Sequence, residues 1–117
     1  MTVARYVLKK PDPQIVQQEI ERITNLVISK SCPKQIYLIG SAAQGTFDAE
    51  SDLDFVVVYG SEEEAKHSYS QILNNIGERL FPIDLLSYSA ERFSSKKNIG
   101  GIPFEAANFG KLLYSKE

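Results

Sequence analysis

Three aspartates occupy positions that apolar side chains would normally fill. Asp52 and Asp54 stand at the start of a strongly apolar run that ends at Tyr59, and Asp84 interrupts the next apolar segment. Side chains two residues apart on a strand share a face, so Asp52 and Asp54 should point the same way. Aspartate is disfavoured in strands, and a buried unpaired charge is costly. A compensating partner is therefore expected at these carboxylates.

If the strands that carry these aspartates pair, all three carboxylates converge on one spot. Like charges at short range repel one another unless a divalent cation neutralises them. Oxygen ligands favour the hard ions Mg²⁺ or Mn²⁺ over zinc. The pattern therefore predicts a metal site formed by Asp52, Asp54 and Asp84.

A glycine-serine pair lies upstream of the aspartates. Gly40-Ser41 follows a short apolar segment, and Gly45 comes four residues after Ser41. Glycine allows the backbone to approach a ligand closely, and a serine hydroxyl with amides at a strand-to-helix turn can bind phosphate oxygens. A phosphate-binding turn followed by a carboxylate cluster is the layout that phosphoryl-transfer chemistry needs.

Strands and helices must hold these residues in place. We expect a helix over 14–29, strands over 35–39, 53–59 and 81–87, a helical turn within 41–47, and helices over 61–79, from 89 onward and over 103–113. Asp12 before Pro13, and Ser61 three residues before Glu64, predict two helix starts. The strand over 53–59 should be central and buried on both faces. The fold class is therefore α/β, a small mixed sheet of three or more strands flanked by helices.

Length and composition limit the function classes. The 117 residues suit a single domain over 1–117, with 1–12 as a lead-in. The net charge of −2 predicts no dedicated nucleic-acid surface. No apolar run approaches the ~20 residues of a membrane-spanning helix, and the N-terminus lacks the apolar core of a signal peptide. We therefore expect a cytoplasmic protein, in which the single cysteine, Cys32, forms no internal disulfide.

Residues 40–58, GSAAQGTFDAESDLDFVVV, resemble the signature of the DNA-polymerase-β-like nucleotidyltransferase superfamily. Residues 42–51 give the spacing between the glycine-serine pair and the paired aspartates, Ser51 precedes the first aspartate, and an apolar run follows the second. The segment around Asp84 is similar to the third carboxylate motif. The short chain is similar to the minimal nucleotidyltransferases of bacteria and archaea, and the resemblance covers residues 14–114.

The resemblance implies a role for each site residue. Asp52 and Asp54 would bind Mg²⁺ carrying the triphosphate, and Asp84 would help to bind a second ion and is a candidate base for the acceptor hydroxyl. Gly40 and Ser41 would hold the β- and γ-phosphates. The nucleotide-binding set also includes Gly45 and Ser51, although Ser51 is read as a turn residue rather than a catalyst.

One position departs from the family pattern. Many relatives carry arginine or lysine at the position of Gln44. Glutamine has no positive charge, so this chain lacks one candidate phosphate contact. Lys96 and Lys97 are alternative cations, but a solvated helix face is the favoured interpretation of that pair.

The resemblance also implies a partner. Minimal members are often encoded beside a small helical protein of the HEPN class, in a toxin–antitoxin pair. The nucleotidyltransferase is then the antitoxin, and it can transfer AMP from ATP to a tyrosine of the toxin. A homo- or hetero-oligomer fits this reading. The alternatives are transfer to a small molecule such as an aminoglycoside, a non-catalytic module that neutralises a partner by contact, and a simple divalent-ion-binding protein.

Overall fold

A computed structural model of the protein describes residues 11–116. The predicted lead-in over 1–12 therefore lies almost wholly outside the described residues. The elements, in chain order, are α2 (Pro13–Lys30), β1 (Gln35–Ile39), α3 (Ser41–Gln44), β2 (Leu53–Tyr59), α4 (Glu62–Asn75), β3 (Ile83–Ser89), α5 (Ala90–Lys96), α6 (Gly101–Phe109) and β4 (Lys111–Ser115).

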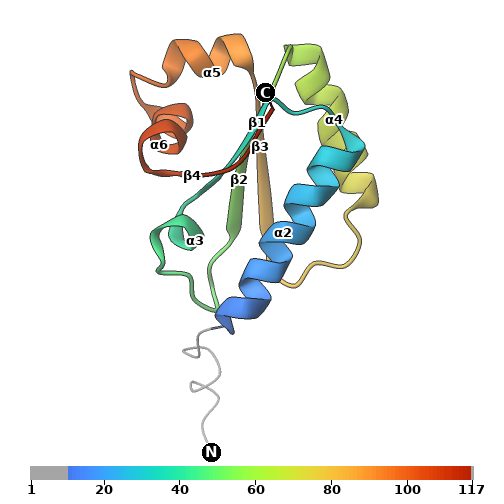
Figure 1. Cartoon of the computed structure of the whole chain (residues 1–117), viewed down its shortest axis with the longest axis vertical. Coiled ribbons are helices and arrows are strands. Elements are labelled where there is room, and N and C mark those ends of the chain that lie inside the picture. The colour runs from blue at the N-terminus through green and yellow to red at the C-terminus, as the bar shows by residue number, and fades with distance from the viewer. Residues whose placement is uncertain (1–10, 117) are drawn as a thin grey trace, which may run out of the picture.

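The strands form one mixed sheet in the order β3-β2-β1-β4. β1 pairs antiparallel with both β2 and β4, whereas β2 and β3 are parallel and are joined through α4. In Figure 1, α2 and α4 lie on one side of the sheet, and α5 and α6 lie on the other. The predicted fold class is confirmed, including the interior position of β2, of which every residue except Asp54 is buried.

The face under α2 and α4 carries the larger core. Apolar residues at helical spacing on α2, Val16, Ile20, Ile23 and Val27, pack there against alternate residues of the sheet that include Leu53, Phe55 and Val57. Both predicted helix starts are present. The Asp12 side chain accepts a hydrogen bond from the Gln14 amide at 2.9 Å, and Ser61 accepts one from the Glu64 amide at 3.2 Å.

The opposite face of the sheet is covered at one end only. Ile39, Val56 and Val58 pack there against Phe93 of α5 and Ala106 of α6. Because strand side chains alternate, this is also the face to which Asp52 and Asp54 point. The smaller core therefore leaves the start of β2 open, where the aspartates stand.

The predicted helix over 103–113 is wrong in its second half. α6 ends at Phe109, and residues 111–115 form β4, which pairs with β1. The change of direction depends on Gly110, because a Cβ there would lie 2.7 Å from the Ala106 carbonyl oxygen and 3.1 Å from that of Leu38. Pairing with β1, rather than any local periodicity, makes this segment a strand.

Two other predicted boundaries also move. The helix expected to reach Arg79 ends at Asn75, because Gly77 takes a left-handed backbone with φ +68°. The strand expected over 81–87 runs from Ile83 to Ser89 instead.

A partly buried ion pair on α2, Arg22–Glu19, holds the segment between α4 and β3. Glu19 is 3% exposed and accepts hydrogen bonds from Arg22 at 2.8 and 2.9 Å and from the Leu80 amide at 3.2 Å. Arg22 donates in turn to the carbonyls of Ile76 and Glu78. This network ties the segment that leads to Asp84 against α2.

Among the helices within residues 11–116, none has the length and apolar character needed to span a lipid bilayer.

Candidate active site

Asp52, Asp54 and Asp84 meet at the start of two neighbouring strands. Asp54 lies directly opposite Asp84 across the parallel pair β2–β3. Each of the three residues offers one carboxylate oxygen, and these oxygens all lie within 4.8 Å of one another. The structure therefore brings together the three side chains as the strand pattern predicts, whereas their role as metal ligands stays a prediction.

The exposure of the three aspartates differs from the expectation. Asp52 and Asp84 are exposed and Asp54 is half-buried, so the interpretation of Asp84 as a buried charge in mid-strand is wrong. β3 begins only at Ile83, which places Asp84 at the open end of the sheet. Water can reach Asp84 there, so it needs no buried counter-charge.

Burial and neighbouring carboxylates change the acidity of Asp54. The pKa of Asp54 is raised to about 6. Burial is the largest cause, followed by the charges of Asp84 and Asp52, a hydrogen bond with Asp84, and the charge of Glu105. A site that crowds negative charge in this way favours a cation. Two oxygens on opposite sides of a Mg²⁺ ion lie about 4.2 Å apart, so the cluster fits a hard divalent cation after small side-chain shifts.

Gly40 forms the next wall of the site. β1 ends at Ile39, which pairs with Asp54, and Gly40 follows with φ +76°. A Cβ on Gly40 would lie 2.7 Å from Asp54 Oδ2. Glycine is thus required by the Asp54 carboxylate as well as by the backbone, because φ +76° with ψ −155° is a combination essentially restricted to glycine.

Ser41 begins the short helix α3 immediately after Gly40. The Ala43 and Gln44 amides of this four-residue helix both donate to the Gly40 carbonyl at 3.1 Å. The Ser41 and Ala42 amides, together with the Ser41 hydroxyl, are therefore the groups of α3 that could bind an anion beside the aspartates. The predicted phosphate contact of Ser41 stays a prediction.

The structure gives Gly45 and Ser51 conformational roles. Gly45 ends α3 with φ +81°, and a Cβ there would meet nothing within 4 Å. The Ser51 hydroxyl donates to Asp48 Oδ1 at 3.0 Å and accepts from the Asp48 amide at 3.0 Å. Ser51 therefore closes the turn that leads into Asp52, and nucleotide contacts of Gly45 and Ser51 are still predictions.

Gln44, the position that departs from the family pattern, contacts α6. Its side-chain amide donates to the Phe109 carbonyl at 3.3 Å. Lys97 does not replace a cation at this position, because it lines a cavity at the other end of the sheet face.

The sequence did not point to Glu105 as part of this site. Glu105 lies on α6, and its charge adds to the raised pKa of Asp54. No motif surrounds it, and its position depends on how α6 packs across β1 and β2. Such a residue can be found only from the tertiary structure.

Comparison with known families identifies the class of protein. A family model described as "Polymerase beta, Nucleotidyltransferase" matches residues 21–117. The chain therefore belongs to this nucleotidyltransferase family, and the resemblance seen in its motifs is confirmed.

A solved structure, described as "Crystal structure of the toxin-antitoxin with AMP-PNP", is similar in fold. The TM-score is 0.52 at 18% sequence identity, and the match covers 83% of this chain and 73% of that chain. At this identity the likeness concerns the fold. No curated protein matches the chain.

Proposed function

We propose that this protein transfers a nucleoside monophosphate, AMP in the favoured case, from a nucleoside triphosphate to an acceptor hydroxyl. The observation that carries the proposal is the set of three carboxylate oxygens within 4.8 Å of one another. They lie beside the Gly40-Ser41 turn, in a chain of the nucleotidyltransferase family. Convergent carboxylates beside available amides suit the transfer of a phosphorus-centred group.

Asp52 and Asp54 would hold one Mg²⁺ or Mn²⁺ ion together with the triphosphate, and Asp84 would complete the site for a second. When bound, the ions stabilise negative charge around the α-phosphorus and make the acceptor hydroxyl more acidic. Because Asp84 is exposed at the open end of the sheet, it can also accept the proton of that hydroxyl.

The turn after β1 would position the triphosphate. The Ser41 hydroxyl and the first amides of α3 would bind the β- and γ-phosphate oxygens, with Gly45 and Ser51 shaping the loop around them. Gln44 brings no charge to these phosphates, so the ions and the amides must supply the attraction. Fixing the α-phosphorus in line with the acceptor provides much of the rate enhancement in such reactions.

We propose a partner protein as the acceptor, a small helical toxin of the HEPN class modified on a tyrosine, with this chain as its cytoplasmic antitoxin. The similar fold of the toxin-antitoxin structure with AMP-PNP, an ATP analogue, supports this choice. Asp52 and Asp84 are exposed, which leaves room for an acceptor as large as a protein.

The acceptor can be identified with α-labelled ATP and Mg²⁺, in the presence of cell lysate or of a co-encoded neighbouring protein. The proposal predicts label on one protein band, lost in Asp54→Asn and retained in Glu50→Gln. Glu50 is a matched control because it is an exposed acidic residue outside the carboxylate cluster.

Two other outcomes separate the alternatives. Label could be recovered only in a small molecule and be lost in Asp54→Asn. That result would support the transfer reaction but reject a protein as its acceptor. The chain could also still neutralise its partner after Asp52, Asp54 and Asp84 are all replaced. That result would reject the catalytic account and favour a module that neutralises the partner by contact alone.

A further inference from the structure

A cavity opens on the face of the sheet to which the aspartates point, but away from them. It has a volume of about 900 Å³ and is lined by residues of β1, β2, β4, α5 and α6 that include Tyr37, Val58 and Phe93. Val58 is four residues beyond Asp54 on β2, which is about 13 Å along a strand. Glu105 of α6 acts on Asp54, whereas Ala107 of the same helix lines the cavity. α6 therefore borders both sites.

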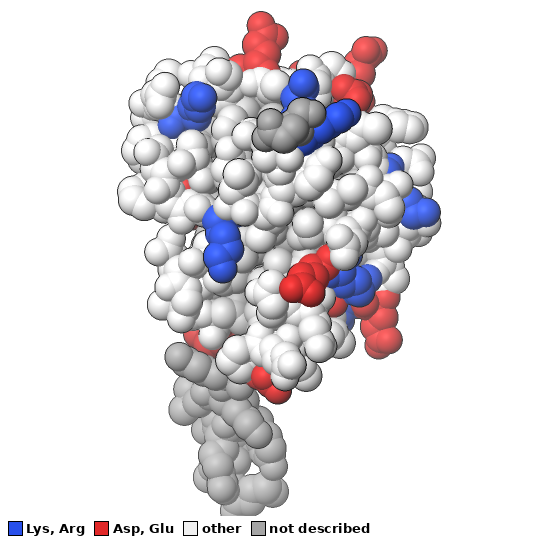
Figure 2. Space-filling view, viewed as in Figure 1, with Lys and Arg blue, Asp and Glu red and all other residues white. Residues whose placement is uncertain are grey.

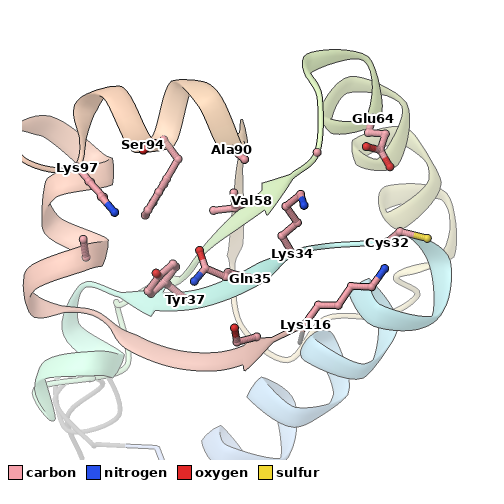
Figure 3. A pocket seen from close by; sticks show the side chains of 14 residues that line it. Cys32, Lys34, Gln35, Tyr37, Val58, Glu64, Ala90, Ser94, Lys97 and Lys116 are labelled. Carbon is pink, nitrogen blue, oxygen red and sulfur yellow. The ribbon is translucent and has the colours of Figure 1, made fainter.

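Three lysines from separate elements surround this cavity. Lys34 precedes β1, Lys116 follows β4, and Lys97 follows α5. The Lys116 amide donates to the Lys34 carbonyl at 2.9 Å, so the backbone holds these two residues beside each other. Figure 3 shows Lys97 reaching into the cavity from α5, and Lys34 rising from the β1 side.

The lining is positively charged. Glu64 is the one acidic residue among the described residues of the lining, so three lysines against one glutamate leave two positive charges. Within residues 11–116 the ion pairs are Arg22–Glu19 and Arg92–Glu62, and neither contains a cavity lysine. Figure 2 shows basic side chains around the C-terminal end of β4 and over α5. These ammonium groups are therefore available to an anion.

The floor of the cavity is apolar and aromatic. The rings of Tyr37 and Phe93 stack with their centroids 5.5 Å apart and their planes 16° from parallel. Val58 beside them is buried, and Gln35, Ser94 and Ser115 add polar groups around them. An apolar floor beneath a few polar and charged groups, in a volume of this size, is typical of small-ligand sites.

We propose that this cavity binds a phosphate-bearing small molecule of nucleotide size, without a divalent cation. The lysines at its rim would hold the phosphates, and the aromatic floor would contact a planar group. This site is separate from the carboxylate cluster, so a failure of the transfer reaction would leave the proposal intact.

Cys32 provides a local probe, because it is the only cysteine of the chain, is exposed and lines the cavity. The rate at which a neutral maleimide modifies Cys32 is measured on the full chain in EDTA, at constant ionic strength, with ATP or with inorganic pyrophosphate. We expect at least fivefold slower modification at saturating ligand. Protection by both ligands would mean that the phosphates suffice, and protection by ATP alone would mean that the base contributes.

The variants decide whether the lysines carry the binding. Lys34→Gln combined with Lys97→Gln should abolish protection, whereas Lys96→Gln should retain it, because Lys96 is an exposed neighbour outside the lining. Lys97→Gln alone should weaken protection. The proposal would be overturned if neither ATP nor pyrophosphate changed the reactivity of Cys32, or if protection survived the double substitution. It would also be overturned if an acidic peptide protected Cys32 and neither ATP nor pyrophosphate did.

Discussion

Gly40 and Asp54 are in close contact across the β1–β2 pair: a Cβ added to Gly40 would stand 2.7 Å from Asp54 Oδ2. The glycine of the Gly40-Ser41 turn and the central aspartate of the carboxylate cluster are therefore one structural unit. The turn can keep its path only while position 40 has no side chain, and the carboxylate keeps its place for the same reason.

This contact predicts that Gly40→Ala damages both stability and transfer. The backbone of Gly40, with φ +76° and ψ −155°, lies in a region that is essentially restricted to glycine and costs an alanine about 1–3 kcal/mol, and the clash with Asp54 adds to that cost. Gly77→Ala is the matched control, because Gly77 also has a positive φ, of +68°, but a Cβ there meets nothing within 4 Å. Urea denaturation should show a larger loss for Gly40→Ala, and equal losses would refute the steric coupling.

Asp54→Asn should stabilise the protein in EDTA at neutral pH. The folded protein raises the pKa of Asp54 to about 6, mainly through burial, so folding favours the protonated form. The stability linked to this group is present below its unfolded pKa and is lost as the pH rises through 6. Because Asp54 is partly solvated, we expect a gain in Tm of roughly 2–4 °C at pH 7.5 and a smaller one near pH 4.

The difference in Tm between Asp54→Asn and the original protein should change sign when a divalent cation binds. Saturating Mn²⁺ should raise the Tm of the original protein more than that of Asp54→Asn, since the ion needs the ionised carboxylate. A variant that is less stable than the original in EDTA at pH 7.5 would contradict the electrostatic account of this cluster.

Glu19→Gln should destabilise the protein by about 2 kcal/mol at pH 7, because it weakens a buried, charge-assisted network. The hydrogen bond from Arg22 lowers the pKa of Glu19, with a smaller contribution from the Leu80 amide. The stabilisation is therefore present above the unfolded pKa and fades as the pH falls below it. Glu21→Gln, an exposed neighbour on α2, should change the free energy of unfolding little. Similar losses in both variants would count against the role given to this network.

Gly110→Ala should cost about 1–3 kcal/mol by overpacking. The φ of Gly110 is −79°, so its requirement for glycine is steric: a Cβ would crowd the carbonyl oxygens of Ala106 and Leu38. Neither backbone group can move without shifting α6 or β1. At Gly100, where a Cβ would meet nothing within 4 Å, the same substitution should be nearly neutral in urea denaturation.

Local patterns predicted the parts of the site that depend on local physics. The apolar run to Tyr59 specified the interior strand, and the two-residue spacing of Asp52 and Asp54 placed both on one face. Asp12 and Ser61 marked their helix starts because a cap acts on amides only two or three residues away.

The remaining features depend on contacts between distant segments. Residues 111–115 become a strand because β1 offers an edge, whereas the sequence pattern favoured a helix as far as residue 113. Glu105 joins the surroundings of Asp54 through the packing of α6, and the buried Glu19 depends on a loop more than fifty residues away. The exposure of Asp84 follows from where β3 begins.

The central claim is that the carboxylate cluster supports nucleotidyl transfer. Its most direct test compares ATP labelled at the α-phosphate with ATP labelled at the γ-phosphate, in Mg²⁺, with an acceptor present. The account predicts α-label on the acceptor, pyrophosphate released in equal amount, no γ-label on the acceptor, and loss of transfer in Asp52→Asn and Asp54→Asn. Transfer of γ-label to the acceptor, or full α-label transfer in both variants, would contradict it.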